Sequence, residues 1–362
     1  MTGNTLGWVI VAFVLYLLMM IAIGAFYAKG NNNSEDYFLG GRKLNGFVAA
    51  LSAQASDMSG WLLMGLPGAI YLTGVGGDGW IAIGLFIGTT LNWLFIATKL
   101  RRYTIRANNS VTLPTYFENR FHDDKKVLMT VSSITIVVFF LVYCASALSA
   151  GGQLFESVFG IDYHVALTIG ALVVLVYTFL GGFTAVCVTD FIQGMLMLVG
   201  ILAVPLFAYH FLTTGGTTLS AGLEASGADS ANFLNLMKNG DGSNNIVSVI
   251  SGLGWGLGYF GMPHILVRFM AVRDEKEMTK SKATAISWVA LSLGFAVFIG
   301  ILGRAYLPEL VNGNNEKVFI EMIKKVFTVE MRAPFIAGLF LCGILAAIMS
   351  TADSQLLVSA SS

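Results

Sequence analysis

One acidic residue stands within a long apolar segment, among side chains that suit a small cation. Asp57 lies between Ser56 and Ser59 in a run that we expect to span a membrane over residues 46–74. A carboxylate inside a span costs about 2.5–3.5 kcal/mol on insertion scales, so its presence there indicates a function. Carboxylate, hydroxyl and freed carbonyl oxygens suit a desolvated monovalent cation. The alternative is that Asp57 caps the half-helix that follows it.

Glycine and proline interrupt this segment and a second one, over residues 246–271. The first break runs from Ala53 to Gly68, and the second from Ser251 to Pro263. Irregular backbone survives at membrane depth only where it is buried in protein or lines a wet cavity. Two interrupted spans, five spans apart, therefore predict the substrate and ion sites of a carrier. The alternative is that both are kinks without function.

Aromatic side chains gather at these breaks. Trp61 follows Asp57, Trp255 and Tyr259 stand at i and i+4 in the second break, and Tyr143 lies on the fourth span. Beside a cation site, such a cluster suits a compact apolar ring that bears a carboxylate and an amine. Packing alone is the alternative.

The last span offers a partner for the first break. Ala347, Ser350 and Thr351 stand at i, i+3 and i+4, so one carbonyl and two hydroxyls share a helix face. Hydroxyls of this kind also commonly bond back to carbonyls of their own helix. Asp190, near the start of the sixth span, is a second cation stop or a group on the exit path; a helix-terminal acid at the interface is the alternative.

Composition indicates a polytopic membrane protein. Of the 362 residues, 56% are hydrophobic and 12% charged, and the mean hydropathy is +0.74. Soluble domains carry about 25% charged residues. The net charge of zero excludes a nucleic-acid footprint. An enzyme is not expected, because the four histidines do not cluster with acids or cysteines, and a channel is not expected without a continuous polar file.

Nine membrane spans are predicted. The first, over 8–28, is interpreted as an uncleaved helix, because no basic residue precedes it and Lys29 follows it. The other eight spans are 46–74, 79–98, 127–157, 163–181, 187–211, 246–271, 283–306 and 334–362.

The three cysteines lie in apolar runs and are interpreted as buried small hydrophobic residues. The segment 310–327 is expected to include a short amphipathic helix on the outer surface.

Basic residues divide unequally between the two sides. Fifteen of 21 fall in alternate loops, which the positive-inside rule places in the cytoplasm, with the N-terminus outside. The segment 213–245 is then an external loop. The fifteen are Lys29, Arg42, Lys43, Lys99, Arg101, Arg102, Arg106, Arg120, Lys125, Lys126, Arg268, Arg273, Lys276, Lys280 and Lys282.

The sequence around these residues resembles the solute:sodium symporter family. The similarity extends over nearly the whole chain and rests on several motifs rather than on one. They are Gly40-Gly41-Arg42, Ala50-Leu51-Ser52-Ala53, the run from Ser56 to Ala69, Tyr143-Cys144-Ala145-Ser146, the run from Gly254 to Gly261, Pro263-His264-Ile265-Leu266, and the run from Leu345 to Thr351.

The resemblance implies roles for individual residues. It implies a sodium site made by the carbonyls of Ala55 and Met58 with Ala347, Ser350 and Thr351, and it places Asp190 on an inward sodium path. Met262 differs from a commoner polar residue, which bears on substrate preference. The substrate and coupling region implied by the resemblance comprises Asp57, Ser59, Gly60, Trp61, Tyr143, Trp255, Tyr259 and Pro263.

The resemblance also implies a fold and an activity. The expected fold is an all-α, LeuT-like bundle of five plus five inverted-repeat helices with one extra N-terminal helix. The chain is expected to be truncated within the second repeat, after the divisions 1–45, 46–211, 212–245 and 246–362. The expected activity is Na⁺-coupled uptake of L-proline by alternating access in a bacterial inner membrane, without an obligate protein partner. Pantothenate, a sugar or another amino acid is the alternative solute.

Overall fold

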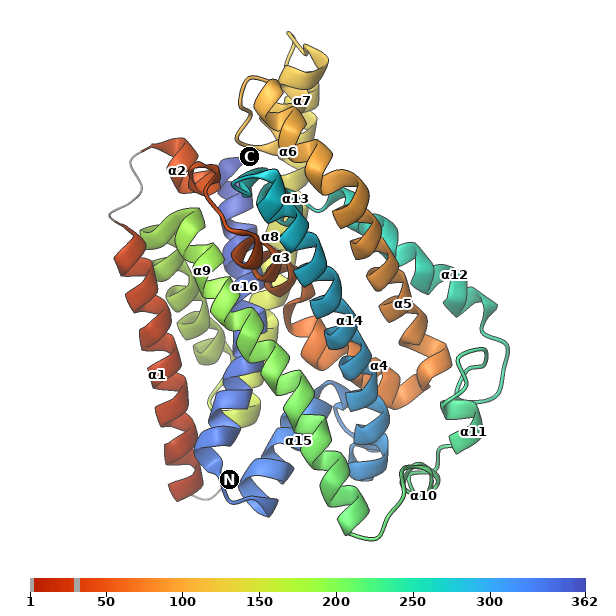
Figure 1. Ribbon diagram of the computed structural model, residues 1–362. Helices are drawn as coiled ribbons and strands as arrows, with labels where there is room; N and C mark the ends of the chain where they lie inside the picture. The colour runs from red at the N-terminus through yellow and green to blue at the C-terminus, as the bar shows by residue number, and fades with distance from the viewer. Residues whose placement is uncertain (1–2, 29–32) are drawn as a thin grey trace.

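The protein is a bundle of long helices. The computed structural model describes residues 3–28 and 33–362, and within these ranges the β-structure consists of two isolated bridges, Leu44 with Val272 and Lys238 with Asn244. Figure 1 shows the long helices running between the two ends of the molecule. The helices are α1 (Gly3–Ala28), α2 (Ser34–Leu39), α3 (Gly46–Gly60), α4 (Leu66–Thr73), α5 (Val75–Leu91), α6 (Ala97–Arg106), α7 (Leu113–Phe121), α8 (Val127–Phe159), α9 (Tyr163–Thr214), α10 (Leu219–Ala225), α11 (Ser230–Phe233), α12 (Ile246–Trp255), α13 (Pro263–Ala271), α14 (Glu275–Tyr306), α15 (Val318–Lys324) and α16 (Pro334–Ser361).

Six of the described helical stretches are long and apolar enough to cross a membrane, or seven if a bent pair counts as one span. The difference from the nine predicted spans has two sources. The first is α9, which has 52 residues and would be about 78 Å long if straight, against a hydrocarbon core of about 30 Å. Gly182 interrupts it with φ 61° and ψ −163°, and Figure 1 shows the chain reversing direction there. The predicted spans 163–181 and 187–211 are therefore the two arms of α9.

The second source is the predicted span 46–74, which the structure divides. It consists of α3, a π-helical segment over Trp61–Gly65, and α4. Ser59 adopts φ 52° and ψ −174°, so the helix is broken two residues after Asp57. The predicted break in 246–271 is also present: α12 continues into a 3₁₀ segment over Gly256–Gly261, and α13 leaves it at an angle of 46°.

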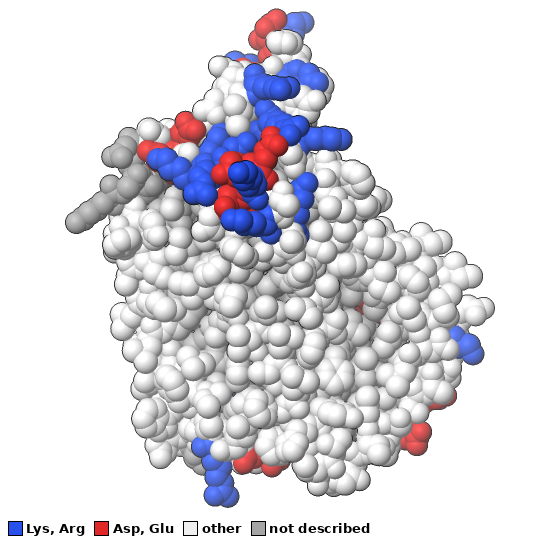
Figure 2. Space-filling model, viewed as in Figure 1, with Lys and Arg blue, Asp and Glu red and all other residues white. Residues whose placement is uncertain are grey.

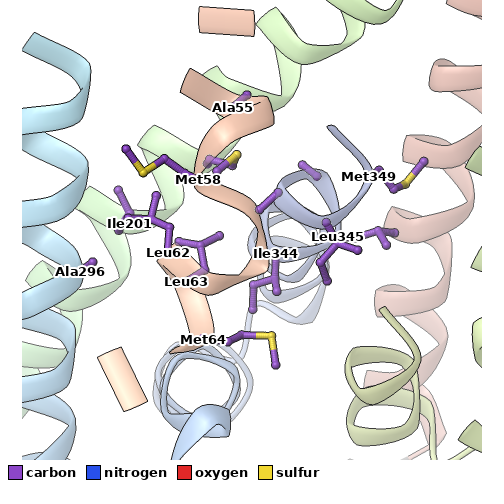
Figure 3. Packing of buried hydrophobic residues seen from close by; sticks show 14 of the residues in the cluster. Ala55, Met58, Leu62, Leu63, Met64, Ile201, Ala296, Ile344, Leu345 and Met349 are labelled. Atoms are coloured by element: carbon purple, nitrogen blue, oxygen red, sulfur yellow. The ribbon is translucent and has the colours of Figure 1, made fainter. Parts of the chain in front are cut away.

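The first break is packed against α9 and α16. Figure 3 shows Ala55, Met58 and Leu62 of this segment beside Ile344 of α16 and Ile201 of α9. These residues belong to one continuous core. Helix α16 is the central helix, because 83% of its most apolar stretch is buried. An interrupted helix is thus held by protein, as irregular backbone at this depth requires.

Helix α5 approaches the second break at backbone distance. A Cβ built on Gly84 would stand 2.2 Å from the carbonyl oxygen of Gly252, and one on Gly88 would stand 2.2 Å from that of Gly256. Small residues allow such close approach between membrane helices. Asn92, one turn further along, donates a hydrogen bond to the carbonyl of Tyr259 at 2.9 Å. The second break is therefore held against α5.

Charged residues gather at one end of the bundle. Figure 2 shows Lys and Arg concentrated beside α6, α7 and α13, while the broad middle of the molecule is uncharged. Arg42 connects two segments at this end, because its guanidinium donates hydrogen bonds to the carbonyls of Met270 and Ser110, both at 2.8 Å. Lys29 lies outside the described residues. Arg268, which the sequence assigned to a loop here, is instead fully buried within the bundle.

Two further segments at the opposite end bear on the predictions. The predicted external loop includes the short helices α10 and α11. The prediction of a surface helix in 310–327 is right about the helix and wrong about its position on the surface. Helix α15 forms there, but Phe319, Ile320 and Met322 are buried, so it is part of the core. The cysteines are buried and free, as predicted.

Candidate functional site

The two breaks enclose a cavity of about 230 Å³. Six residues predicted for the substrate region line it together, although they come from three separate parts of the chain. The lining also includes Met262, together with Leu85, Met58 and Gly258, which the sequence analysis did not assign to the solute. The six are Asp57, Ser59, Trp61, Tyr143, Trp255 and Tyr259.

Aromatic rings form the apolar wall. Trp61 and Trp255 stack with ring centroids 5.8 Å apart and an interplanar angle of 23°. Offset stacking of this kind holds both rings in place. Tyr143 donates its hydroxyl to the backbone carbonyl of Asp57 at 3.4 Å, a long contact that orients the phenol toward the first break. The cavity therefore has a flat apolar side next to a polar side.

Asp57 supplies the charge of the polar side. The residue is 8% exposed, and its Oδ1 lies 3.8 Å from Nε2 of His264. Across the described part of the chain, its other oxygen, Oδ2, has no hydrogen-bond partner, and neither do the two ring nitrogens of His264. A buried carboxylate oxygen without a donor is costly, so this group is available to a cationic ligand.

Ser59, rather than Asp57, caps the segment that follows the break. Its hydroxyl accepts a hydrogen bond from the backbone N–H of Trp61 at 3.1 Å. The capping role considered for Asp57 is therefore not observed. The Asp57 carboxylate is not used as a cap, and its Oδ2 has no hydrogen-bond partner among the described residues.

Two of the groups predicted to bind sodium are in contact where α3 meets α16. The Ser350 hydroxyl donates to the carbonyl of Ala55 at 2.9 Å, across the two helices. Both this hydroxyl and that of Thr351 donate to the carbonyl of Ala347, at 3.2 and 3.0 Å. Back-bonding within the helix is thus present, as the alternative supposed, but Ser350 also reaches the broken helix. The Met58 carbonyl accepts from the N–H of Trp61 at the break itself.

Asp190 is not at an interface. It is fully buried and pairs with Arg268, whose Nη2 lies 2.9 Å from its Oδ2. Ser52 of α3 donates to the same oxygen at 2.6 Å. The interpretation as a helix-terminal acid at the interface is wrong, because Asp190 is buried inside the bundle, eight residues after the kink at Gly182.

Arg268 links a second buried acid into this cluster. Its Nη2 donates to the Ser354 hydroxyl at 2.5 Å, and that hydroxyl donates to Oδ1 of Asp353 at 3.1 Å. Tyr177 donates to the other oxygen of Asp353 at 2.6 Å. Sequence reasoning missed Arg268 and Asp353, although an acid three residues after Ser350 in an apolar span was a signal that could have found the second.

A second cavity, of about 550 Å³, adjoins the first. Both are lined by Ser59, Trp61, Tyr143, Trp255 and Met262. The second cavity extends to Glu316, which follows α14 at the end of the molecule away from the basic cluster. Gly60 lines this second cavity, whereas Pro263 lines neither and begins α13 instead.

The arrangement defines a class of protein. Two broken helices enclose a cavity with a free carboxylate, an aromatic wall and a neighbouring set of carbonyl and hydroxyl oxygens, all inside an all-helical membrane bundle. Discontinuous helices that expose such groups near the middle of the membrane are typical of LeuT-like secondary transporters.

Comparison with known proteins identifies the family. The Sodium:solute symporter family profile matches residues 37–362. A sodium/proline symporter of Salmonella typhimurium is 45% identical over 358 residues, which are 97% of this chain and 68% of that protein. The sodium/proline symporter of Haemophilus influenzae is 45% identical over 361 residues, covering 98% and 69%. One from Staphylococcus aureus is 43% identical over 355 residues, covering 97% and 66%.

A solved structure confirms the fold. The substrate-bound, outward-open structure of a Na⁺-coupled sialic acid symporter superposes with a TM-score of 0.79 at 21% identity, covering 98% of this chain and 73% of that one. The chain belongs to the sodium:solute symporter family. It is therefore a multi-span, Na⁺-coupled solute symporter and not an enzyme, and Na⁺ is its cosubstrate.

Proposed function

We propose that the protein couples inward Na⁺ movement to the uptake of L-proline. The observation that carries this is the cavity shared by Asp57, Trp61 and Trp255, which puts a free carboxylate beside an aromatic wall. Proline is a compact apolar ring with an ammonium and a carboxylate, so the ring suits the wall and the ammonium suits Asp57. The identity of about 45% to sodium/proline symporters supports this choice of solute.

Sodium binds, in this proposal, where α3 meets α16. The donors are the carbonyls of Ala55, Met58 and Ala347 with the hydroxyls of Ser350 and Thr351, which are hard oxygen ligands suited to Na⁺. The Ser350 hydroxyl donates a hydrogen bond to the carbonyl of Ala55. When sodium binds, the ion takes the place of this hydrogen bond, because the Ser350 and Ala55 oxygens can both direct a lone pair to it. Sodium then holds the break in one geometry and prepares Trp61 for the solute.

Transport follows by alternating access. Sodium and solute enter from the side that the second cavity faces, and the loaded bundle then rocks to the other side. The Asp190–Arg268 pair lies between the sodium site and the basic end, so Asp190 marks the inward path. One Na⁺ crossing about 100 mV releases roughly 2.3 kcal/mol, and a tenfold gradient adds roughly 1.4 kcal/mol. Their sum supports accumulation of several hundredfold.

The orientation and the repeat organisation belong to the same proposal. We place the basic end in the cytoplasm of a bacterial cell, with the N-terminus outside. Residues 46–211 form the first five-helix repeat and 246–362 part of the second, separated by the external segment 212–245. Residues 1–45 add the extra helix and a cytoplasmic loop. The corresponding positions of the two breaks support this division.

Binding of labelled proline to the purified chain, with and without Na⁺, tests the proposal. Binding should require Na⁺, and unlabelled proline should compete at much lower concentration than pantothenate or sugars. If another solute competes better than proline, the fold assignment stands and the substrate changes. Uptake into proteoliposomes with an inward Na⁺ gradient then tests coupling.

Single variants separate the two sites. Asp57→Asn should abolish Na⁺-stimulated binding while the protein stays in the membrane. Thr351→Ala should raise the sodium concentration for half-maximal binding. An unchanged sodium response would mean that the Thr351 hydroxyl bonds only to its own helix and does not bind sodium. Trp255→Ala should weaken proline more than sodium, since it removes the stacked wall. Trp8→Ala, at the exposed start of α1, is the matched control.

A further inference from the structure

A long apolar groove lies on the lipid-facing side of the bundle, apart from the solute cavity. It has a volume of about 780 Å³ and runs between α3, α9 and α14. Phe47 and Leu51 of α3, Met195 of α9, and Trp288 and Leu291 of α14 line it. Trp288 is buried at its base, with its indole N–H donating to the Gly194 carbonyl at 3.2 Å. The base of the groove is therefore rigid.

The groove has the length and position of a single leaflet. On α14 it extends from Ala283 to Leu291 and on α3 from Asn45 to Leu51. Eight residues of helix rise about 12 Å, close to half of a hydrocarbon core of about 30 Å. Phe47 is 53% exposed, which suits a neighbour that is itself apolar. One end of the groove is deep in the membrane and the other meets the polar interface.

The interfacial end is polar and carries an excess of positive charge. Thr284 and Ser287 line the groove at its α14 wall, and Lys280 stands one turn above Thr284 on the same face. Lys280 also packs against the start of α3, because a Cβ built on Gly46 would stand only 3.0 Å from the Cβ of Lys280. Figure 2 shows the basic cluster directly above the uncharged face on which α9 and α14 lie.

The charges around this end do not cancel. Glu277 is shared among the N–H of Gly46, Lys280 and Arg273, at 2.6, 2.8 and 3.3 Å. Asp274 contacts Arg273 as well. Glu275 is the third acid of this segment, and five basic residues against three acids leave two net positive charges. The five are Lys43, Arg273, Lys276, Lys280 and Lys282.

We propose that this groove binds one anionic phospholipid, with an acyl chain along α14 and its phosphate beside Lys280. The charge excess selects the headgroup, because an anionic lipid gains from each nearby Lys while a zwitterionic lipid does not. The apolar length of the groove takes the chain. Because α3 carries the broken helix and α14 packs against it, the bound lipid contacts the elements that hold the solute site. The leaflet follows from the proposed orientation, but the binding chemistry does not depend on it.

Native mass spectrometry of the purified chain tests this, with phosphatidylglycerol and phosphatidylcholine of matched acyl chains as probes. Phosphatidylglycerol should be retained at least about fivefold better, and Lys280→Gln should remove most of that preference, since one Lys near an anionic surface is worth about fivefold. Ser287→Trp, which fills the groove, should reduce retention of both lipids. Lys238→Gln at the other end and Leu172→Trp on exposed α9 surface are the matched controls.

The remaining outcomes overturn the proposal. Equal retention of the two lipids would remove the headgroup selection, and retention unaffected by Ser287→Trp would place the lipid elsewhere. A dimer that Ser287→Trp dissociates would make a second copy the occupant. Lipid retention is measured without Na⁺ or proline, so its failure is separable from failure of the proposed transport. An unchanged unfolding transition of Lys280→Gln in detergent micelles shows that this variant is folded.

Discussion

The buried pair of Arg268 and Asp190 should be among the most sensitive points of the structure. Both side chains are fully buried, and Arg268 donates to four groups: Asp190, the hydroxyls of Ser52 and Ser354, and the carbonyl of His264. Arg268→Met leaves the Asp190 carboxyl without a counter-charge and with only the Ser52 hydroxyl as a donor. Removing one partner of a buried pair costs roughly 3–5 kcal/mol.

The double variant gives the sharper result. Asp190→Asn alone should also destabilise, because it leaves the guanidinium without its main counter-charge. The combination Asp190→Asn with Arg268→Met removes both charges and should cost much less than the sum of the single changes. Asp353 keeps its hydrogen bonds from Tyr177 and Ser354. It also loses the nearby charge of Arg268, but that loss is common to the single and the double variant that carry Arg268→Met, so it largely cancels in the cycle.

Reversible unfolding in mixed detergent and dodecyl sulfate micelles gives the free energies for this double-mutant cycle. A coupling free energy of about 2 kcal/mol or more is expected, at the upper part of the range for residues in direct contact. Additive costs, with coupling below about 0.5 kcal/mol, would refute the view that the two charges depend on each other. Arg102→Met, which breaks an exposed pair with Glu275, is the control and should change stability by less than about 1 kcal/mol.

Two other changes test the packing of the bundle. Gly84→Ala should destabilise by roughly 1–3 kcal/mol in the same unfolding assay, because the added methyl group meets a backbone carbonyl that cannot turn aside; Gly170→Ala, with open space at its Cβ, should be close to neutral, and equal effects would contradict the close approach. Arg42→Lys should speed hydrogen exchange in residues 104–110, because a single ammonium cannot replace a guanidinium that bridges two carbonyls. Arg106→Lys on the exposed surface should leave that exchange unchanged.

Local sequence predicted the two breaks in the helices well. Glycine and proline at 60–68 and 252–263 indicated irregular backbone, and the structure has non-helical angles at Ser59 and a bend before Pro263. Such residues act through their own dihedral angles, so they can be recognised without knowing their neighbours. The same reasoning could not tell whether Asp57 or Ser59 caps the break, because that depends on where each side chain points.

The buried charge cluster shows the limit of this reasoning. Arg268 was counted with the cytoplasmic loop because its neighbours in sequence include Arg273 and Lys276. Its burial follows from Asp190 and Ser354, which approach from other helices. The residues next to Arg268 in the sequence do not show which other helices pack against it. The sequence analysis therefore placed this buried residue in an exposed loop.

The amino-acid sequence by itself determined that this is a many-span membrane protein with two interrupted helices and charge concentrated at one end. These properties depend on hydropathy, glycine and proline, which act over a few residues. Only the tertiary structure decided that six predicted residues share one cavity, that Ser350 reaches across to Ala55, and that Asp190 is neutralised by Arg268. These are contacts between segments tens to hundreds of residues apart, and the packing of helices around α16, rather than any local pattern, brings them together.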